Sequence, residues 1–337
     1  MRIQQLRERL RALGAKPCHE ARVLRAWLQA KPLDSGRVAA GDYLPGPLRA
    51  ELPALTDELA GLARLRSAHP GADGSSRLLV SLTDGQTIES VLLLRDGLCV
   101  SSQVGCAVGC TFCMTGRDGL LRQLTSGEIV AQVVLGRSLR PVKKVVFMGM
   151  GEPAHNLDNV LEAIELLGTL GNIGHKNLVF STVGDARVFE RLPLGMVKPA
   201  LALSLHSSRT GVRAQLLPKA PRIDPAELVA QADAYGRATG YPVQYQWTLI
   251  EGINDTNEEM AGLVRLLKGR YGLMNFIPYN ETESPDAIDF RRPAPARIAE
   301  IVRQLTHHGI LTKLRQSAGQ DVEGGCGQLR ARHISLR

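Results

Sequence analysis

From residue 97 onwards, short apolar runs of strand length alternate with longer stretches in which apolar residues recur at helical spacing. This alternation is typical of a parallel sheet built from βα units. The chain carries fewer such units than the eight of a closed barrel, so we expect an α/β fold with an open, partial (β/α)6 barrel of the TIM type. The predicted strands are 98–102, 144–149, 178–183, 200–206, 243–250 and 274–278, with a further strand at 311–316, and the predicted helices are 126–137, 156–170, 185–192, 223–238, 256–269 and 294–308.

The residues before this pattern form a separate, mostly helical region. Apolar residues at helical spacing predict a helical hairpin over 3–13 and 19–30 and a third helix over 47–65. A segment rich in Gly, Ser and Pro at 69–76 indicates a turn or linker, and Asp84-Gly85 is typical of a hairpin turn between strands at 77–82 and 87–94. We therefore predict three parts: a small N-terminal helical accessory domain at 1–70, a short β-hairpin linker at 71–96, and the barrel with a C-terminal loop at 97–337.

Composition narrows the class of partner. The 337 residues include 41 Lys and Arg against 33 Asp and Glu, a net charge of +8, and residues 1–50 hold ten basic and four acidic side chains. This surplus suits a polyanion such as RNA or DNA, although a solvated basic helix face would have the same composition. No apolar run approaches the ~18 residues that cross a bilayer, and the charged N-terminus lacks a signal-peptide core. We therefore expect a cytoplasmic protein without a membrane partner.

Six cysteines, at 18, 99, 106, 110, 113 and 326, offer the clearest chemistry. Cysteines clustered in a chain without a secretory segment are more typical of metal or redox sites than of disulfide staples. Cys106, Cys110 and Cys113 form a C-x3-C-x2-C pattern directly after the first predicted barrel strand. Three thiolates suit a [4Fe-4S] cluster with one iron left open, whereas a structural zinc site would need a fourth ligand such as His155. We expect Cys18 to be a small buried apolar residue.

The C-x3-C-x2-C spacing, with Phe112 before the last cysteine, resembles the signature of the radical S-adenosylmethionine (SAM) superfamily. This resemblance implies that the three cysteines ligate a [4Fe-4S] cluster whose open iron binds SAM, and that one electron from the cluster cleaves SAM to a 5′-deoxyadenosyl radical. The GMGEP segment at 149–153 resembles the superfamily's glycine-rich segment, whose backbone meets the amino group of SAM. The same resemblance places SAM contacts at Gly151, Glu152, Ser181, Ser204, Leu205, His206 and Asn280, of which the last five could instead be strand-end caps or turn residues.

Three longer segments resemble the RlmN/Cfr family of radical SAM RNA adenosine methyltransferases. They are LCVSSQVGCAVGCTFC at 98–113, LTSGEIVAQV at 124–133 and DVEGGCGQL at 321–329. The resemblance implies methylation of a ring carbon, C2 in preference to C8, of an adenosine in large-subunit ribosomal RNA and also in tRNA, with the accessory domain binding the RNA. The chain departs from the family's usual pattern at Gly324-Gly325 and in the SAGQD segment before them, which leaves the choice of substrate open.

The family resemblance also assigns roles to two more cysteines and a carboxylate. It implies that Cys326 takes a methyl group from one SAM, and that the radical from a second SAM removes a hydrogen so that this carbon adds to adenine. Cys99 would then attack the sulfur of Cys326, releasing the RNA and leaving a transient disulfide that an external reductant reopens. Glu89 aligns with the general base that takes the ring proton, although an exposed strand carboxylate is the alternative. A flavodoxin-like electron donor is also implied.

Two other classes of function fit the same residues. A radical SAM enzyme could act on a different RNA, or on a protein or small molecule, although Cys99 and Cys326 argue against this. A noncatalytic iron–sulfur RNA-binding protein could retain the fold without cleaving SAM. Detection of 5′-deoxyadenosine after reconstitution of the cluster would separate this binding protein from both enzymes.

Overall fold

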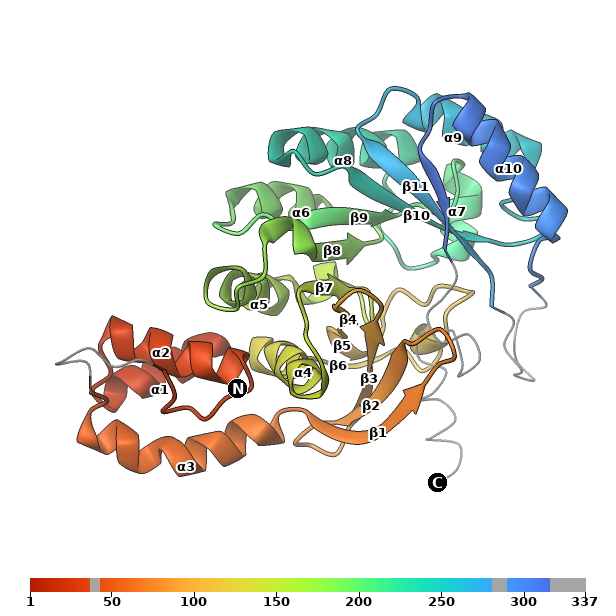
Figure 1. Cartoon of the computed structure of the whole chain (residues 1–337). Helices are drawn as coiled ribbons and strands as arrows, with labels where there is room; N and C mark the ends of the chain where they lie inside the picture. The colour runs from red at the N-terminus through yellow and green to blue at the C-terminus, as the bar shows by residue number, and fades with distance from the viewer. Residues whose placement is uncertain (37–42, 281–289, 316–337) are drawn as a thin grey trace.

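The structure, a computed structural model, describes residues 1–36, 43–280 and 290–315. Its main element is a ten-stranded sheet in the order β1-β2-β3-β4-β7-β8-β9-β10-β11-β12 (Figure 1). The pairs from β1 to β4 are antiparallel, and the pairs from β4 to β12 are parallel. The strands are β1 (Arg64–Pro70), β2 (Ser76–Ser81), β3 (Thr87–Leu93), β4 (Gly97–Cys99), β7 (Lys144–Phe147), β8 (Leu178–Thr182), β9 (Ala200–Ser204), β10 (Val243–Leu249), β11 (Gly272–Pro278) and β12 (Thr312–Leu314).

Helices alternate with the parallel strands, which confirms the α/β fold predicted from the sequence. They are α4 (Ser126–Leu139), α5 (Leu157–Thr169), α6 (Ala186–Arg191), α8 (Pro225–Thr239), α9 (Asn257–Leu267) and α10 (Pro295–His307). One more helix, α7 (Thr210–Leu216), was not predicted. Its apolar pattern is only about two turns long, which is too short for periodicity to reveal it.

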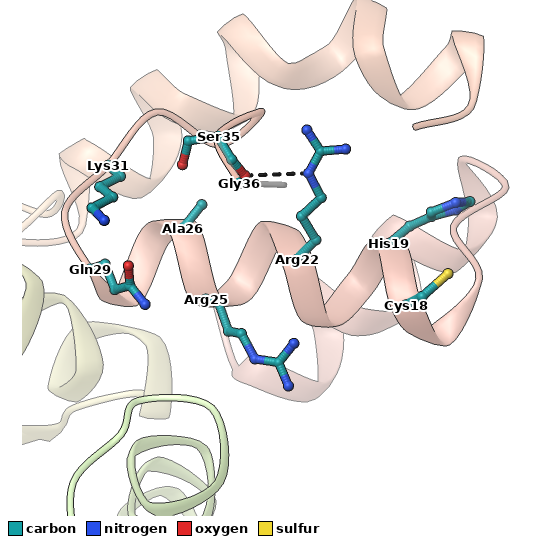
Figure 2. Close-up of a pocket in the computed structure, with 9 residues that line it drawn as sticks. All are labelled: Cys18, His19, Arg22, Arg25, Ala26, Gln29, Lys31, Ser35 and Gly36. Atoms are coloured by element: carbon teal, nitrogen blue, oxygen red, sulfur yellow. Dashed lines mark hydrogen bonds between the residues drawn. The ribbon is translucent and has the colours of Figure 1, made fainter. Parts of the chain in front are cut away.

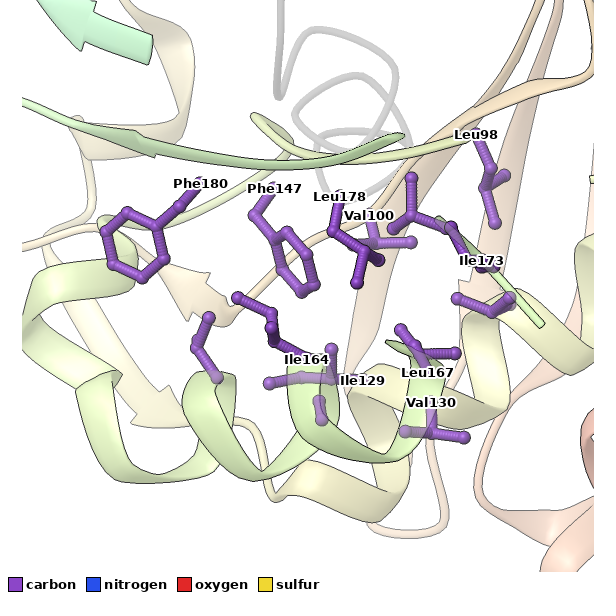
Figure 3. Close-up of a cluster of buried hydrophobic side chains, with 14 of the residues drawn as sticks. Leu98, Val100, Ile129, Val130, Phe147, Ile164, Leu167, Ile173, Leu178 and Phe180 are labelled. Carbon is purple, nitrogen blue, oxygen red and sulfur yellow. The ribbon is translucent and has the colours of Figure 1, made fainter. Parts of the chain in front are cut away.

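One face of the parallel strands, here called the outer face, packs against the helices. Phe147 and Phe180 lie on this face together with Leu98, Val100 and Leu178, and they meet apolar side chains of α4 and α5 (Figure 3). These side chains are almost completely buried. Each fully buried residue of this size stabilises the fold by about 1.5–3 kcal/mol relative to an exposed one.

Because successive residues of a strand point to opposite sides of the sheet, the neighbours of these residues line the other, inner face. A second buried cluster lies there, with Cys99, Val146, Val179, Ala200 and Ala202 as its members. Their side chains are short. A barrel interior lined by small side chains can hold a ligand, whereas large side chains would fill it.

The N-terminal region consists of α1 (Ile3–Ala12), α2 (Pro17–Leu28) and α3 (Gly46–Gly61), which lie beside α4 in Figure 1. A carboxylate of the barrel fixes its start: Glu162 on α5 accepts hydrogen bonds from the backbone N–H of Gln4 at 2.7 Å and from Ser126 Oγ at 2.6 Å. Ser126 Oγ in turn accepts from the N–H of Ile3 at 2.9 Å. The accessory helices are therefore joined to the barrel by hydrogen bonds, of which that from Ile3 is buried, as well as by apolar packing.

Two sequence predictions for this region are corrected. The helix predicted over 47–65 ends at Gly61, and residues 64–70 form β1, which the sequence analysis missed. β1 pairs with β2 from Arg64 opposite Ser81 to Pro70 opposite Ser76, so its conformation is set by its partner strand more than by its own polar residues. The hairpin predicted within 71–96 is present, since β2 pairs with β3, and it continues the main sheet because β3 also pairs with β4. No helix in the described part of the chain is long and apolar enough to cross a membrane.

Candidate active site

Two short paired strands hold the base of the loop that carries the three clustered cysteines. β5 (Gln103–Gly105) pairs with β6 (Leu120–Gln123), and the N–H of Cys106 donates to the carbonyl of Gly119 at 2.9 Å. Gly105 has φ +82°, and a Cβ there would lie 2.1 Å from the Gly119 carbonyl oxygen, so only glycine fits. The loop thus follows β5. The sequence analysis had placed it directly after the first barrel strand, which ends earlier, at Cys99.

The three thiols of this loop lie close enough to influence one another. Burial, together with the charges of Glu152 and Cys113, raises the pKa of Cys106 to about 12. Burial also raises the pKa values of Cys110 and Cys113, and the Cys110 thiol is affected by both other cysteines. The N–H of Thr111 donates to the carbonyl of Leu216 at 3.0 Å, which ties the loop to the end of α7. The three thiols therefore lie near one another, on one buried and two half-buried residues, and their raised pKa values keep them protonated at neutral pH.

The GMGEP segment follows β7 and lies against β5, at the base of the cysteine loop. Gly151 has φ +101°, and a Cβ there would come within 2.6 Å of the Gln103 side chain. Gln103 Oε1 accepts from the N–H of Glu152 at 2.7 Å, and the Glu152 carboxylate accepts from the N–H groups of Ala154 and Val183, each at 3.0 Å. Burial raises the pKa of Glu152 to about 7 despite these hydrogen bonds. Hydrogen bonds to Gln103 on one side and to Ala154 and Val183 on the other therefore hold the segment in place.

The Ser204-Leu205-His206 turn comes at the end of β9. His206 adopts the left-handed conformation with φ +57°, and its Nδ1 accepts from the N–H of Thr248 at 3.0 Å. Its ring packs against Phe112 of the cysteine loop, with a centroid distance of 4.8 Å. Burial, aided by the positive charge of Arg213, lowers the pKa of His206 to about 3, so the imidazole is neutral. The structure thus brings the cysteine loop and this turn together.

Two buried residues that the sequence analysis missed hold the turn in place. Glu259, at the start of α9, is fully buried and accepts from Ser207 Oγ at 2.6 Å and from the N–H and Oγ of Ser208 at 2.7 and 2.6 Å. Asn254 Nδ2 donates to the carbonyls of His206 and Thr248, each at 2.8 Å. Both residues lie about fifty positions along the chain from the turn, and no local motif marks them.

Arg213 on α7 is a third residue that sequence reasoning missed. It is 4% exposed and donates from Nη2 to the carbonyls of Val183 and Ser204. Its burial lowers the pKa of the guanidinium to about 10, while the charges of Cys110 and Glu152 act in the opposite direction. Its Nε has no hydrogen-bond partner within the part of the chain that the structure describes. Arg213 therefore supplies a buried positive charge between the cysteine loop and the GMGEP segment.

Cys99 and Glu89 lie together at the edge of the inner face. Cys99 ends β4, and burial raises the pKa of its thiol to about 12, with Arg77 lowering it and Glu89 raising it by their charges. Glu89 on β3 is 2% exposed and pairs with Arg77 at 3.3 Å between Oε2 and Nη1. The alternative interpretation of Glu89 as an exposed strand carboxylate is therefore wrong. Glu89 also raises the pKa of Cys113 by its charge.

The remaining predicted site residues fall at strand ends or outside the described residues. Ser181 lies on the inner face of β8, where it pairs with Ala202, and Asn280 follows the end of β11. Both are half-buried. Cys326 lies outside the described residues. Cys18 is exposed on α2, so the prediction of a buried apolar role for it is wrong. The sequence pattern of this short helix did not show which side of it faces solvent.

Comparison with known proteins matches this arrangement to one superfamily. Residues 100–267 match the family model described as the radical SAM superfamily. A probable RNA methyltransferase of Azoarcus sp. (strain BH72) is 72% identical over 336 residues, covering 100% of this chain and 96% of that protein. A probable RNA methyltransferase of Ectopseudomonas mendocina (strain ymp) is 64% identical, covering 100% of this chain and 97% of that protein. The chain belongs to the radical SAM superfamily.

A solved structure agrees with this assignment over the whole fold. The crystal structure of a radical SAM methyltransferase from Sphaerobacter thermophilus superposes with a TM-score of 0.81 at 34% sequence identity, covering 97% of each chain. The match includes the N-terminal helices as well as the barrel, since nearly the whole of each chain is covered. The sequence-based prediction of a radical SAM fold is thus confirmed.

Membership of the radical SAM superfamily implies a [4Fe-4S] cluster and SAM, and the residues present fit both. A zinc site would hold its ligands about 4 Å apart, because Zn–S bonds are about 2.3 Å long. No three His, Cys, Asp or Glu side chains among the described residues are arranged to bind one ion, and the neighbours that influence His155 are Asp185 and Arg187. Three neighbouring thiols suit a cluster, in which each binds a different iron.

Different residues of the radical SAM site would have different roles. Cys106, Cys110 and Cys113 would hold the cluster, which on reduction allows SAM to be cleaved to a radical. The GMGEP segment would offer backbone groups and the Glu152 carboxylate to the amino group of SAM, and the buried Arg213 supplies a positive charge near Cys110 and Glu152. The rings of Phe112 and His206 pack against each other, and this contact would help to keep water from a reactive radical.

Proposed function

We propose that this chain is a radical SAM RNA methyltransferase that acts on a ring carbon of adenosine, at C2 in preference to C8. The proposed substrates are an adenosine of large-subunit ribosomal RNA and of tRNA. Proteins that are 64–72% identical over the whole chain carry the name probable RNA methyltransferase, which supports the class of reaction. Cys326 would carry the methyl group, Glu89 would take the ring proton, and Cys99 would release the product by attacking the Cys326 sulfur.

The observation that carries this proposal is the grouping of Cys99, Glu89 and Cys113. Glu89 acts by its charge on the thiols of both cysteines, so one buried carboxylate lies near both the proposed resolving thiol and a proposed cluster ligand. A radical SAM enzyme that only generates a radical needs neither a buried thiol nor a buried base at this place. A thiol whose pKa is about 12 is also a poor nucleophile until a base takes its proton. This property fits a cysteine that must wait for the last step.

The accessory helices support a polyanionic substrate. A hollow of about 470 Å³ on α2 is lined by Arg22, Arg25 and Lys31, with Cys18 and His19 at one end (Figure 2). Arg25 and Gln29 also line a second hollow, which continues over the end of α5 to His175. None of the three cations carries an ion pair within the described residues, although Arg22 donates to the carbonyls of Asp34 and Ser35. A cationic track of this kind suits the phosphates of folded RNA.

The test is to trap the proposed protein–RNA adduct. Cys99→Ala protein, expressed with its cluster and isolated under denaturing conditions, should retain RNA covalently bound, because the thiol that would release it is missing. Sequencing of the trapped RNA would then give the molecule and the position. Cys99→Ala/Cys326→Ala protein is the control and should retain none. If Cys99→Ala protein holds its cluster and cleaves SAM but traps no RNA, the proposed substrate class is wrong.

A further inference from the structure

A row of polar side chains crosses four adjacent strands on the inner face of the barrel. Strand register places Ser204 opposite Gln246, Gln246 opposite Asn275, and Asn275 opposite Lys313, on β9, β10, β11 and β12. Residues paired across parallel strands point to the same side of a sheet. Ser204 is two residues from Ala202, a member of the inner cluster, so the row faces the barrel interior. One end of the row is thus a predicted SAM contact and the other end is a cation.

The amides in the middle of this row are buried without adequate partners. Asn275 is 1% exposed, and its Nδ2 has no hydrogen-bond partner within the described residues. Gln246 is 5% exposed, and its Nε2 donates only at 3.4 Å, to the carbonyl of Gln244 on the same strand. An unpartnered buried amide costs about 1–3 kcal/mol, so such a group in a folded protein calls for an explanation. A ligand with a donor–acceptor edge would satisfy both side chains.

Positively charged side chains lie near the Lys313 end of the row. Lys144, at the start of β7, lies on the same inner face as Val146. Burial lowers the pKa of Lys144, and the positive charges of Arg315 and Lys313 lower it further, so these three cations lie near one another although their strands are far apart in the sheet. None of the three has an ion pair with a carboxylate in the described ranges. Like charges held together in this way favour an anion between them.

We propose that Gln246, Asn275 and Lys313, with Lys144 and Arg315, form the seat of the substrate nucleotide. The amides of Gln246 and Asn275 bind the edge of the adenine ring, and the three cations bind the backbone phosphates that flank it. This inference rests on the proposed function and adds to it the residues that select the base. Side-chain amides match the donor–acceptor edge of adenine, which is the usual reason that Asn and Gln recognise this base.

The geometry explains how an adenosine could reach the radical chemistry. A base modified inside an enzyme must leave its stack, and it is then recognised through hydrogen bonds to its edge. The row leads from Lys313 on β12, the last strand on its side of the sheet within the described residues, to Ser204 beside the His206 turn, so a nucleotide held along it would direct its base toward the cofactor position. The large aromatic side chains Tyr245, Trp247 and Phe276 belong to the outer cluster, so hydrogen bonds and charge, more than stacking, would hold the nucleotide.

The first experiment measures base selection by the cluster-loaded full-length protein. The probes are single-stranded RNAs of about ten nucleotides with one central adenosine or guanosine in a uridine background. Wild-type protein should prefer the adenosine RNA. Asn275→Ala should lower this preference about tenfold, as expected for loss of one amide contact to a base edge, and leave the affinity for guanosine RNA nearly unchanged. Asn275→Asp keeps the shape of the side chain, so it should show the same loss even if Asn275→Ala is poorly folded.

The second experiment measures the phosphate contacts. Lys144→Gln and Lys313→Gln should each weaken binding of both RNAs equally and lower the slope of log affinity against log salt by about one. Lys143→Gln is the matched control, because Lys143 is adjacent in sequence but exposed and paired with Asp96 at 2.8 Å. It should leave affinity and salt slope unchanged.

Each result decides the inference separately from the proposed function. The inference is overturned if wild-type protein does not discriminate between the RNAs, or if the Asn275 and Lys144 variants keep wild-type selectivity and salt slope. If these variants behave as predicted while Cys99→Ala protein traps no RNA, the seat stands and the methyl-transfer proposal fails. If RNA is trapped while the seat variants behave as wild type, the inference alone fails.

Discussion

The loop of Cys106, Cys110 and Cys113 and the turn of His206 touch through Phe112, yet their polar groups are satisfied in different ways. On the His206 side, Glu259 and Asn254 provide hydrogen bonds to the turn from within the protein. On the cysteine side, burial raises the pKa of all three thiols, so they stay neutral unless a metal binds them. The His206 turn, here called the His206 wall, is held in place by the protein alone. The cysteine loop, here called the cysteine wall, would be completed by its cofactor. The variants below test this difference.

The largest effect is expected on the cysteine wall. Cys110→Ala should abolish cluster binding, because two remaining thiolates cannot hold three irons, and both the iron content and the absorbance near roughly 400 nm should be lost. Cys18→Ala is the matched control, since Cys18 is exposed on α2, far from the loop in sequence. Its iron content should equal that of the wild type. A Cys110→Ala protein that keeps a full cluster would contradict the ligand assignment.

On the His206 wall, removal of a carboxylate should act on stability even without a cofactor. Glu259→Ala should lower the free energy of unfolding of the cluster-free protein by about 3–5 kcal/mol, because it leaves the buried donors of Ser207 and Ser208 without an acceptor. Urea unfolding measures this loss. Glu258→Ala provides the control: Glu258 is exposed and forms an exposed ion pair with Arg209, so about 1 kcal/mol or less should be lost. Equal effects of the two variants would remove the contrast between the walls.

A smaller, graded effect is expected from pH. The pKa of His206 is lowered to about 3, whereas an unfolded histidine titrates near 6.5. Between these values the unfolded chain binds a proton that the folded protein does not bind. The free energy of unfolding should therefore fall as pH falls below about 6.5, by at most about 1.4 kcal/mol per pH unit for this group.

Denaturant unfolding of the cluster-free protein at several pH values between 7.5 and 5.5, each about half a unit apart, would measure this slope. His206→Asn keeps an acceptor for the N–H of Thr248 and does not titrate, so its slope should be shallower by about one proton. His308→Asn replaces an exposed histidine and should keep the wild-type slope. A His206→Asn protein with an unchanged slope would show that His206 is not buried as a neutral group.

The sequence revealed the parts of this molecule that depend on local patterns. The parallel strands, their helices and the C-x3-C-x2-C loop follow from residues that are close together in the chain. Strand β1 was missed because its polar residues become a strand only by pairing with β2. Glu259, Asn254 and Arg213 were missed for a related reason: each acts on a turn or loop that the fold brings near it, and neither spacing nor composition connects them.

The two edge strands of the ten-stranded sheet determine whether strands of two molecules can pair. β12 is the last strand on its side within the described residues, and it is short, with Lys313 at its centre and Arg315 next to its end. β1, at the opposite edge, carries Arg64 and Arg66 and ends at Pro70. Short, charged and proline-terminated edges discourage strands of two molecules from pairing. Lys313 and Arg315, which we assign to phosphate binding, therefore also disfavour edge-to-edge aggregation of the sheet.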